Sequence, residues 1–277
     1  MDITNKDIKI LVCVIHGPYE PWLTILREGQ LQTWMNTFPD VKKVNVFGEP
    51  ISKKLLNIDQ VLYFKRWSPI KIVAYFSLFV EAVLKKTLNL DRFHPQVDKF
   101  DQEEHISTWT IRMPDSLLLQ GVKNLATFRA SLEEDFDYLI TTITSSYLNL
   151  GIIKDYLTIQ ESKNFLGGRI ENSGQVNYQQ GSFRVYSRDV VEYICQNSKN
   201  YKHWQIEDIA MGNLINLRYE NLHSMTNVSV SSIQEASELT PEQFTSTMSY
   251  RCKSINGHKR NDSEIMHLIH NQLQQIR

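Results

Sequence analysis

Two acidic residues, Glu207 and Asp208, stand together at the start of a predicted helix. A carboxylate held beside a hydroxyl group can act as a general base, removing the proton as the oxygen attacks an electrophile. Asp208, which is followed by Ile-Ala-Met, would serve equally well as the N-cap of its helix. The residues alone therefore leave two roles open for Asp208, and Glu207 could either hold a ligand or lie in solvent.

A Gly-Ser corner, Gly181-Ser182, precedes the acidic pair. It opens a short predicted strand, Ser182 to Tyr186, which passes into a helix over Ser187–Cys195 with Ser187 as its N-cap. A tight corner, a strand, a capped helix and a carboxylate pair form an uncommon combination.

Basic residues suited to phosphate occur late in the chain, at Arg251 and Lys253. Arginine presents a fixed fork of donors that matches phosphate oxygens. The alternative for this stretch is an alternating strand that carries two solvated cations.

A third candidate segment, His16-Gly17-Pro18, follows the apolar run Ile8–Ile15. Ligands in open α/β sheets bind beyond the carboxyl ends of the strands, where this segment would lie. A turn that merely ends the strand is the alternative. The pair His267 and His270 could share a helix face, but without a third ligand we expect that face to be solvated.

The elements around these residues alternate between strand and helix. Ile8–Ile15 has the apolar, branched composition of a buried strand, and Pro21–Phe38 has helical spacing before a second strand at Val41–Phe47. This order predicts a βαβ unit and therefore a parallel sheet. Phe93–Ile106 is polar without a clear period and is expected to be a loop.

The second half of the chain is predicted in the same way. The expected elements are a helix over Leu117–Leu132 capped by Asp115-Ser116, a strand at Phe136–Ile140, a helix at Leu148–Leu157, a loop or hairpin at Asn164–Gln180, a helix from Glu207 to about Leu217, a strand at Val228–Ile233 and an amphipathic helix at Asp262–Ile276.

The stretch Trp67–Leu90 is helical in period and unusually apolar, with Lys and Arg residues around it. A buried helix pair is the favoured interpretation, because a helix that is apolar all round is usually buried. The alternative is an interfacial helix, with Trp67 and the lysines meeting anionic lipid headgroups.

Composition excludes several classes of protein. The 277 residues are 42% hydrophobic and 22% charged, with a formal net charge of -1, so the chain is expected to fold and not to bind nucleic acid. Cys13, Cys195 and Cys252 show no metal or disulfide spacing, and the N-terminus lacks a secretory signal. We expect a cytoplasmic protein, with peripheral contact to a membrane as an alternative.

Four common catalytic or nucleotide-binding motifs are absent from the sequence, namely GxGxxG, GxxxxGK, GxSxG and HExxH. Their absence disfavours a dehydrogenase, a P-loop enzyme, a hydrolase and a zinc protease.

Five motifs in this order resemble a GT-A glycosyltransferase of the Fringe and β-galactosyltransferase-like branch. They are Arg27 with Thr33-Trp34 and then Val46-Phe47-Gly48, Asp115-Ser116 with Lys123, the strand Phe136–Ile140, Gly181-Ser182 with Ser187-Arg188-Asp189, and Glu207-Asp208 with Gly212.

The resemblance implies a single GT-A type α/β domain over residues 1–277, with a mainly parallel twisted sheet flanked by helices. Residues 1–150 would form the nucleotide-sugar half, and 151–277 the acceptor half and a C-terminal tail over the donor. The implied activity is inverting transfer of a sugar, favoured to come from a UDP-sugar, to a glycan hydroxyl. Asp208 would be the catalytic base, and Gly181, Ser182 and Glu207 would shape the acceptor side.

The sequence departs from the family at the donor side. Where the family has a metal-binding DxD motif, this chain has Thr141–Ser146, and hydroxyls are poor ligands for Mn²⁺ or Mg²⁺. Mn²⁺ and Mg²⁺ remain candidate cofactors, although the chain has no DxD motif to hold either of them. Two alternatives stay open: a metal-independent transfer, or a non-catalytic protein that binds a glycan or a partner. In the first alternative, the donor is bound by His16, Gly17, Thr142, Thr144, Ser145, Arg251 and Lys253.

Overall fold

The structure is a computed structural model of the whole chain. It describes residues 7–65, 69–87, 90, 93–103, 105–174, 176–203, 205–219, 221–254 and 260–276. Trp67, part of the predicted interfacial helix, lies outside these residues.

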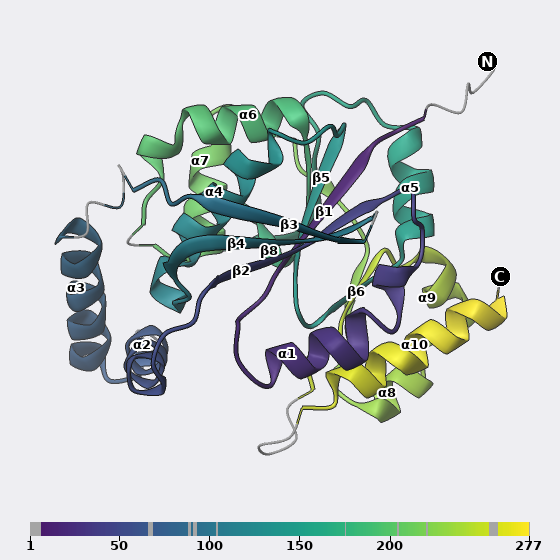
Figure 1. Cartoon of the computed structure of the whole chain (residues 1–277), viewed down its shortest axis with the longest axis horizontal. Helices are drawn as coiled ribbons and strands as arrows, with labels where there is room; N and C mark the ends of the chain where they lie inside the picture. The colour runs from purple at the N-terminus through teal and green to yellow at the C-terminus, as the bar shows by residue number, and fades with distance from the viewer. Residues whose placement is uncertain are drawn as a thin grey trace.

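A large mixed sheet forms the centre of the molecule (Figure 1). Its strands in spatial order are β3 (Val97–Glu103), β4 (Ile106–Pro114), β2 (Lys42–Glu49), β1 (Ile10–Ile15), β5 (Tyr138–Ile143), β8 (Asn177–Ser187), β7 (Leu166–Asn172) and β9 (His223–Ser224). The four strands β4, β2, β1 and β5 run parallel, whereas β3 and β8 are antiparallel to their neighbours. The carboxyl ends of the parallel strands therefore meet at one edge, where α/β proteins bind ligands.

Helices cover both faces of this sheet (Figure 1). One face is covered by α4 (Gln120–Ser131), α6 (Arg188–Gln196) and α7 (Glu207–Ile215), and the other by the π-helix Ile25–Gln30, α5 (Leu150–Thr158), α9 (Pro241–Ser246) and α10 (Asp262–Ile276). In β1, Val12 and Val14 enter one buried cluster and Leu11 and Cys13 the other. Because side chains alternate along a strand, an apolar run like β1 is stable only when both faces are covered.

The remaining elements are short or peripheral. They are α1 (Trp22–Thr24), α2 (Lys53–Lys65), α3 (Lys71–Thr87), α8 (Ile233–Ser237), the 3₁₀ turns Trp34–Asn36, Leu117–Leu119 and Ser198–Asn200, and a small sheet in the order β10 (Asn227–Ser229), β11 (Ser249–Arg251) and β6 (Ser146–Leu148). Within the described residues, no helix combines the length and apolar character that a bilayer span requires.

The predicted fold class is confirmed: this is an α/β protein with a mainly parallel sheet flanked by helices. The strands at the start of the chain and the tail helix form as predicted. The strand predicted at Ser182–Tyr186 lies within β8, and the segment predicted as a loop or hairpin, Asn164–Gln180, forms β7 and the first part of β8. Ile265, Met266, Ile269 and Leu273 of α10 are buried, as the amphipathic pattern predicted.

Two predictions about local structure are wrong. The expected loop at Phe93–Ile106 contains the strand β3, whose polar sequence suits an edge position where one side is open to solvent. The expected continuous helix over Pro21–Phe38 is divided into α1, a π-helix and a 3₁₀ turn. The periodicity gave the buried face correctly, since Trp34 and Met35 are in the core.

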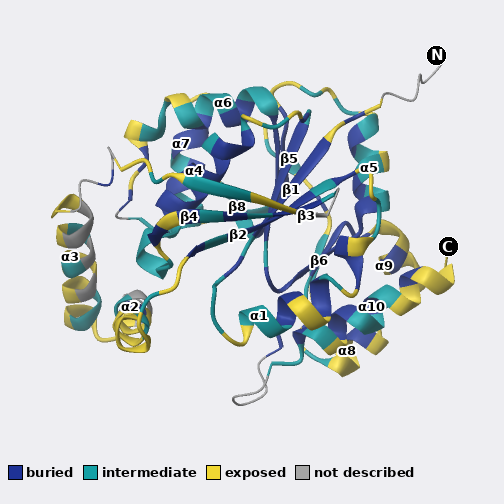
Figure 2. Ribbon diagram, viewed as in Figure 1, coloured by how far each residue is buried: buried dark blue, intermediate teal, exposed yellow. Residues whose placement is uncertain are grey.

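The favoured prediction of a buried helix pair around Trp67–Leu90 is also wrong. The helix described within this stretch, α3, packs mainly against α2 and exposes large apolar side chains, so these helices protrude from the body (Figures 1 and 2). Ile72 is 80% exposed and Tyr75 is 70% exposed. The apolar composition of the stretch predicted burial, but the described elements of the body leave this face of α3 open to solvent.

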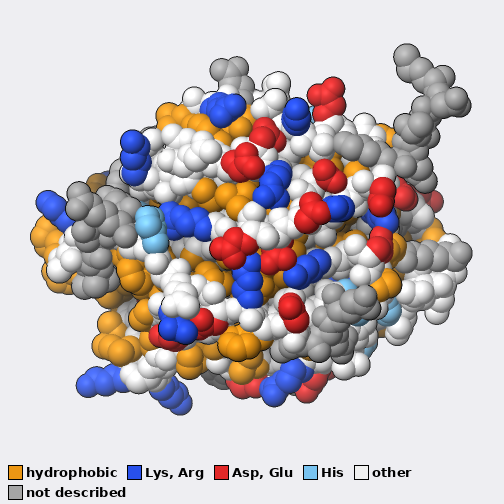
Figure 3. Space-filling view, turned by 45° about the horizontal axis from the view of Figure 1, so that its top comes forward, with side chains coloured by type: hydrophobic (Ala, Val, Ile, Leu, Met, Phe, Trp, Pro, Cys, Tyr) orange, Lys and Arg blue, Asp and Glu red, His pale blue; other side chains and the backbone are white. Residues whose placement is uncertain are grey.

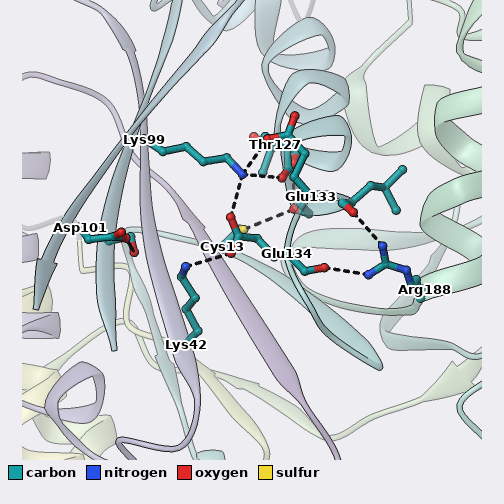
Figure 4. A network of polar contacts seen from close by, with 12 residues as sticks. Cys13, Lys42, Lys99, Asp101, Thr127, Glu133, Glu134 and Arg188 are labelled. Atoms are coloured by element: carbon teal, nitrogen blue, oxygen red, sulfur yellow. Dashed lines mark hydrogen bonds and ion pairs between the residues drawn. The ribbon is translucent and has the colours of Figure 1, made fainter. Parts of the chain in front are cut away.

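A network of charges ties the sheet to the end of α4 (Figure 4). Glu134 accepts hydrogen bonds from Lys42 on β2 (2.9 Å) and from Lys99 on β3 (2.7 Å). Arg188, at the start of α6, donates to the backbone carbonyls of Leu132 and Glu134. Burial alone would raise the pKa of Glu134, but the two lysines outweigh it and lower the pKa.

We predict that Glu134→Gln lowers the free energy of unfolding by about 2 kcal/mol. Lys42 loses its carboxylate partner, and Lys99 loses the shorter of its two ion pairs and keeps the one to the exposed Glu133, at 3.1 Å. Glu133→Gln is the matched control, because the side chain of Glu133 is 73% exposed, and we expect it to cost less than about 0.5 kcal/mol. Since the pKa of Glu134 is lowered on folding, its contribution should be present at neutral pH and disappear as the pH falls through that pKa. Urea unfolding of both variants measures this, and equal losses would contradict the assignment.

Candidate functional site

The Gly181-Ser182 corner and the end of β5 are joined at one carbonyl group. The hydroxyl of Thr142 donates to the Ser182 carbonyl at 2.7 Å, and that of Ser146 donates to the same oxygen at 3.0 Å. Thr142 lies opposite Phe183 in the antiparallel pairing of β5 and β8. The two segments that were predicted for the donor and acceptor sides are therefore neighbours.

Arg184, which follows this corner on β8, organises the acidic pair. Its side chain is 2% exposed, and its guanidinium donates to both carboxylate oxygens of Glu207, at 2.8 and 2.7 Å. The Nη2 group also bonds Asp208, and Nε donates to the Gln179 carbonyl at 3.1 Å. One buried cation thus positions two carboxylates.

Two further hydrogen bonds hold Glu207. Asn124 on α4 donates to its carboxylate at 2.6 Å, and the Tyr201 hydroxyl donates to its backbone carbonyl at 3.3 Å. Although burial alone would raise the pKa of Glu207, the bidentate bonds from Arg184 outweigh it and lower the pKa. Glu207 is therefore a fixed anion.

Asp208 differs from Glu207 in its electrostatics. Burial raises the pKa of its carboxyl, and the neighbouring Glu207 anion adds to the rise, which reaches about 7 in spite of the opposing charge of Arg184. Its side chain remains 27% exposed, so a ligand can reach the carboxylate. A carboxyl with a pKa near neutrality is suited to exchange protons.

The N-cap alternative for Asp208 is not supported by the geometry. Ile206 occupies the N-cap position of α7, and Asp208 lies within the first turn with its carboxylate bonded to Arg184. Ser187 does occupy the predicted N-cap position of α6, but its hydroxyl bonds Asp189 and does not cap the helix.

Gly181 leaves room for the acidic pair. A Cβ atom at this position would lie 2.9 Å from Asp208 Oδ1 and 3.2 Å from Arg184 Nη2. The backbone of Gly181 also makes a hydrogen bond to Asp208. The predicted base, Asp208, and the predicted acceptor residues Gly181, Ser182 and Glu207 are thus brought together, while the Ser182 side chain is buried and bonded to Gln180.

A cationic pocket lies beside this cluster. It has a volume of about 190 Å³ and is lined by Ser229, Val230, Ser231, Arg251 and Lys253. Arg251 and Lys253 supply two positive charges, and none of the described lining residues is acidic. Arg251 Nε is buried and has no hydrogen-bond partner among the described residues.

Two further arginines act on this pocket. Burial lowers the pKa of Arg251, and the charge of Arg169 lowers it further. Arg260 contributes to the lowered pKa of Lys253 in the same way, after burial and Arg251. Arg169 and Arg260 are themselves paired with Glu171 and Asp262, so the repulsion that an anion in the pocket would relieve is chiefly that between Arg251 and Lys253.

The register of the small sheet places Arg251 next to the Thr141–Ser146 segment. Arg251 lies opposite Ser146 in the pairing of β11 and β6, and the Cys252 amide donates to the Ser145 carbonyl at 2.7 Å. Strand β7 links the pocket to the acidic pair: Gly168 pairs with Arg184, and the next residue, Arg169, donates to Ser229 of the pocket lining at 2.9 Å. The predicted donor residues on these two segments therefore share one region.

His16 is placed differently from the other candidate donor residues. Its ring is buried, with Nδ1 2.9 Å from the Thr144 hydroxyl and Nε2 3.0 Å from Asn45 Oδ1. Burial lowers the pKa of His16 to about 3, so the ring is neutral at physiological pH. The ring positions Thr144, the His16 amide donates to the Val46 carbonyl at 2.9 Å, and the His16 carbonyl accepts from Lys123. Of the two residues, Gly17, which is partly exposed, is the one placed to face a ligand.

Several residues of the resembling motifs position this edge of the sheet. Gln30 and Trp34 donate to the Ser146 carbonyl, each at 3.1 Å. Lys123 is buried and donates to Asp115 and to the His16 carbonyl. Residues that are far apart in the sequence therefore hold the same edge of the sheet in place.

The residues at the end of β5 do not fit a divalent cation. The hydroxyls of Thr142 and Thr144 are occupied by Ser182 and His16, and a carboxylate is lacking in Thr141–Ser146. Across the described residues, no group of three or more His, Cys, Asp or Glu side chains could hold a metal ion. Hard cations in proteins are bound mainly by carboxylates.

Sequence reasoning missed Arg184 and Arg169. A signal for Arg184 was present, since a charged residue between Phe183 and Val185 in a central strand requires a buried partner. Arg169 gave no comparable signal, because it reaches the pocket only through the pairing of β7 with β8 and its hydrogen bond to Ser229 (2.9 Å).

No family model matches this chain, and no curated protein matches it. Among solved structures, the chain is similar to the apo structure of WbbM, described as a bifunctional glycosyltransferase. The identity is 10% and the TM-score 0.46, over 98% of this chain and 51% of the other, so this chain spans about half of that one. At this level of similarity the match assigns no activity.

We predict that Arg184→Met lowers the free energy of unfolding by about 3–5 kcal/mol, because it leaves two carboxylates without their buried cation. The loss should be largest above neutral pH, where both carboxylates are ionised, and smaller at acidic pH. Arg112→Met is the control, because Arg112 is an exposed surface cation paired with Asp98. A loss for Arg184→Met no larger than for the control, in urea unfolding, would show that the cluster does not hold the fold.

Proposed function

We propose that the chain transfers a sugar from a nucleotide-diphosphate donor to a glycan hydroxyl with inversion. The observation that supports this most is that an accessible carboxylate of raised pKa, Asp208, is linked through Arg184 and strand β7 to a pocket that presents Arg251 and Lys253. A base on one side and phosphate-binding cations on the other are the two requirements of this reaction. The motif order that resembles GT-A enzymes gives the same assignment.

Asp208 would accept the proton of the acceptor hydroxyl. As that oxygen forms its bond to the anomeric carbon, the bond from the carbon to the diphosphate breaks and its electron pair leaves with the phosphate oxygen. Attack opposite the leaving group inverts the anomeric centre. Glu207 stays ionised and keeps Arg184 in place, which orients Asp208 for this transfer.

Arg251 and Lys253 would neutralise the diphosphate. Their side chains line the pocket. Arg169 and Arg260, although paired with Glu171 and Asp262, still act on the two cations and lower their pKa. Arginine and lysine can stabilise a leaving diphosphate by charge and hydrogen bonding. Since the end of β5 does not fit Mn²⁺ or Mg²⁺, we assign no step to a metal, and a metal-independent transfer is part of the proposal. UDP is the nucleotide that we favour.

A non-catalytic role is the second candidate. One observation favours it: Arg184 is bonded to Asp208 as well as Glu207, and an ion pair makes a carboxylate a weaker base. In this case the fold would bind a glycan or a partner without turnover.

We predict that a UDP-sugar stabilises the protein without added metal, by about 2.7 kcal/mol at a concentration of 100 times its Kd. Arg251→Met together with Lys253→Met should remove this stabilisation. Arg112→Met, which removes an exposed cation elsewhere, should leave it unchanged. A thermal-shift panel of UDP, GDP and CMP sugars with and without Mn²⁺ measures it. Absence of any shift would contradict the donor assignment.

We predict that Asp208→Asn lowers turnover by about 10²–10⁴-fold, because the amide cannot accept the proton. Donor binding should be nearly unchanged, since the substitution preserves shape and lies outside the pocket lining. Asp135→Asn, at an exposed carboxylate, is the control. Turnover unchanged in Asp208→Asn would exclude Asp208 as base, and donor binding without turnover in the parent protein would favour the non-catalytic role.

The pH dependence follows from the raised pKa of Asp208. A general base works only when ionised, so kcat/KM should rise with pH through an apparent pKa of about 7. An unperturbed aspartate would give a plateau from about pH 5 upward. A flat profile between about pH 5 and 8 would show that Asp208 is not the group that limits the reaction.

A further inference from the structure

The helices α2 and α3 together form a protruding hairpin with an exposed apolar face. On α3, Ile72, Tyr75, Phe76 and Phe79 follow helical spacing and are each 65% exposed or more. Residues spaced in this way lie along one side of a helix. Aromatic side chains in such a row are rarely left in water without a binding partner.

The second helix extends this face. Leu55, Ile58 and Val61 of α2 are each about half exposed, and Ile70 lies between the helices. Figure 2 shows exposed residues along both helices, and Figure 3 shows hydrophobic side chains gathered at the same edge of the molecule. The apolar surface is therefore a continuous feature of the hairpin.

The hairpin is fastened to the body of the protein through α2. Asp59, which is buried, accepts a hydrogen bond from the Leu117 amide at 2.8 Å and another from the Ser116 hydroxyl. It thereby caps the 3₁₀ turn that leads into α4. The apolar face is held in a defined orientation at the side of the molecule.

The charge of the hairpin is strongly positive. Residues 53–87 include seven Lys and Arg against two Asp and Glu, although the whole chain has a net charge of -1. Lys53, Lys54, Lys65, Lys71 and Lys86 are exposed. One of the two acidic residues, Asp59, is already used in the cap.

Apolar residues bordered by lysines match an anionic lipid surface. Aromatic and aliphatic side chains enter the boundary between headgroups and acyl chains, while lysines meet the phosphates. A symmetric dimer through the same face would bring the two sets of lysines together, which is unfavourable. We propose that the α2–α3 hairpin docks the protein on the surface of an anionic bilayer, independently of the sugar-transfer function.

The test is co-flotation of the full-length protein with phosphatidylcholine vesicles that contain or lack about 30% phosphatidylglycerol. We expect binding to the anionic vesicles, reduced at least about tenfold by the triple variant Tyr75→Ser, Phe76→Ser, Phe79→Ser. The control removes three other exposed apolar side chains, by Phe100→Ser, Ile159→Ser and Leu217→Ser, and should bind like the parent protein.

A charge variant separates the two parts of the surface. Lys71→Glu with Lys86→Glu should weaken binding most at low salt, because it acts through charge. Circular dichroism and thermal unfolding confirm that each variant is folded. No binding of the parent protein to anionic vesicles, or equal binding by the triple variant, overturns the proposal. If the parent protein self-associates but does not bind vesicles, and only the triple variant abolishes the self-association, the partner of this face is a second copy of the chain and not a bilayer.

Discussion

The candidate site depends on one buried cation. Arg184 stands in a central strand with almost no exposure, and such a charge is stable only when its partners compensate the loss of water. Glu207 and Asp208 provide this compensation, and they come from the first turn of a helix on the adjacent face. The requirement to satisfy one guanidinium therefore fixes the position of α7 relative to the sheet and the orientation of the two carboxylates. It also divides their roles, since Glu207 is held as an anion and Asp208 keeps a raised pKa near solvent.

The Ser182 carbonyl connects this cluster to the cationic pocket. Thr142 and Ser146 both donate to it, and Ser146 in turn aligns with Arg251 across the small sheet. In this chain the hydroxyls of Thr142 and Ser146 join the end of β5 to the Gly181-Ser182 corner. The positive charge of the pocket comes from Arg251 and Lys253, which lie late in the chain.

Local patterns predicted much of the fold and part of the site. The apolar run of β1 predicted a buried strand, and the amphipathic spacing of α10 predicted a helix with one buried face. The polar edge strand β3 and the π-helix Ile25–Gln30 were not predictable in this way, because they depend on pairing and on a side-chain target, Ser146, that is remote in sequence. The stretch Trp67–Leu90, which contains α3, was mispredicted as a buried helix pair, since an apolar sequence does not by itself identify what covers a face. Asp208, Arg251 and Gly181 were proposed from the sequence, and their roles stay predictions, whereas the contact of Arg169 with Ser229 emerges only once the strands are paired.

The most direct test of the central claim is a crystal structure of the protein with a UDP-sugar that resists transfer. We expect the diphosphate to lie within hydrogen-bond distance of Arg251 and Lys253. The anomeric carbon should lie on the side that Asp208 faces, with Asp208 still bonded to Arg184. A nucleotide bound away from this pocket, or a sugar turned away from Asp208, would contradict it.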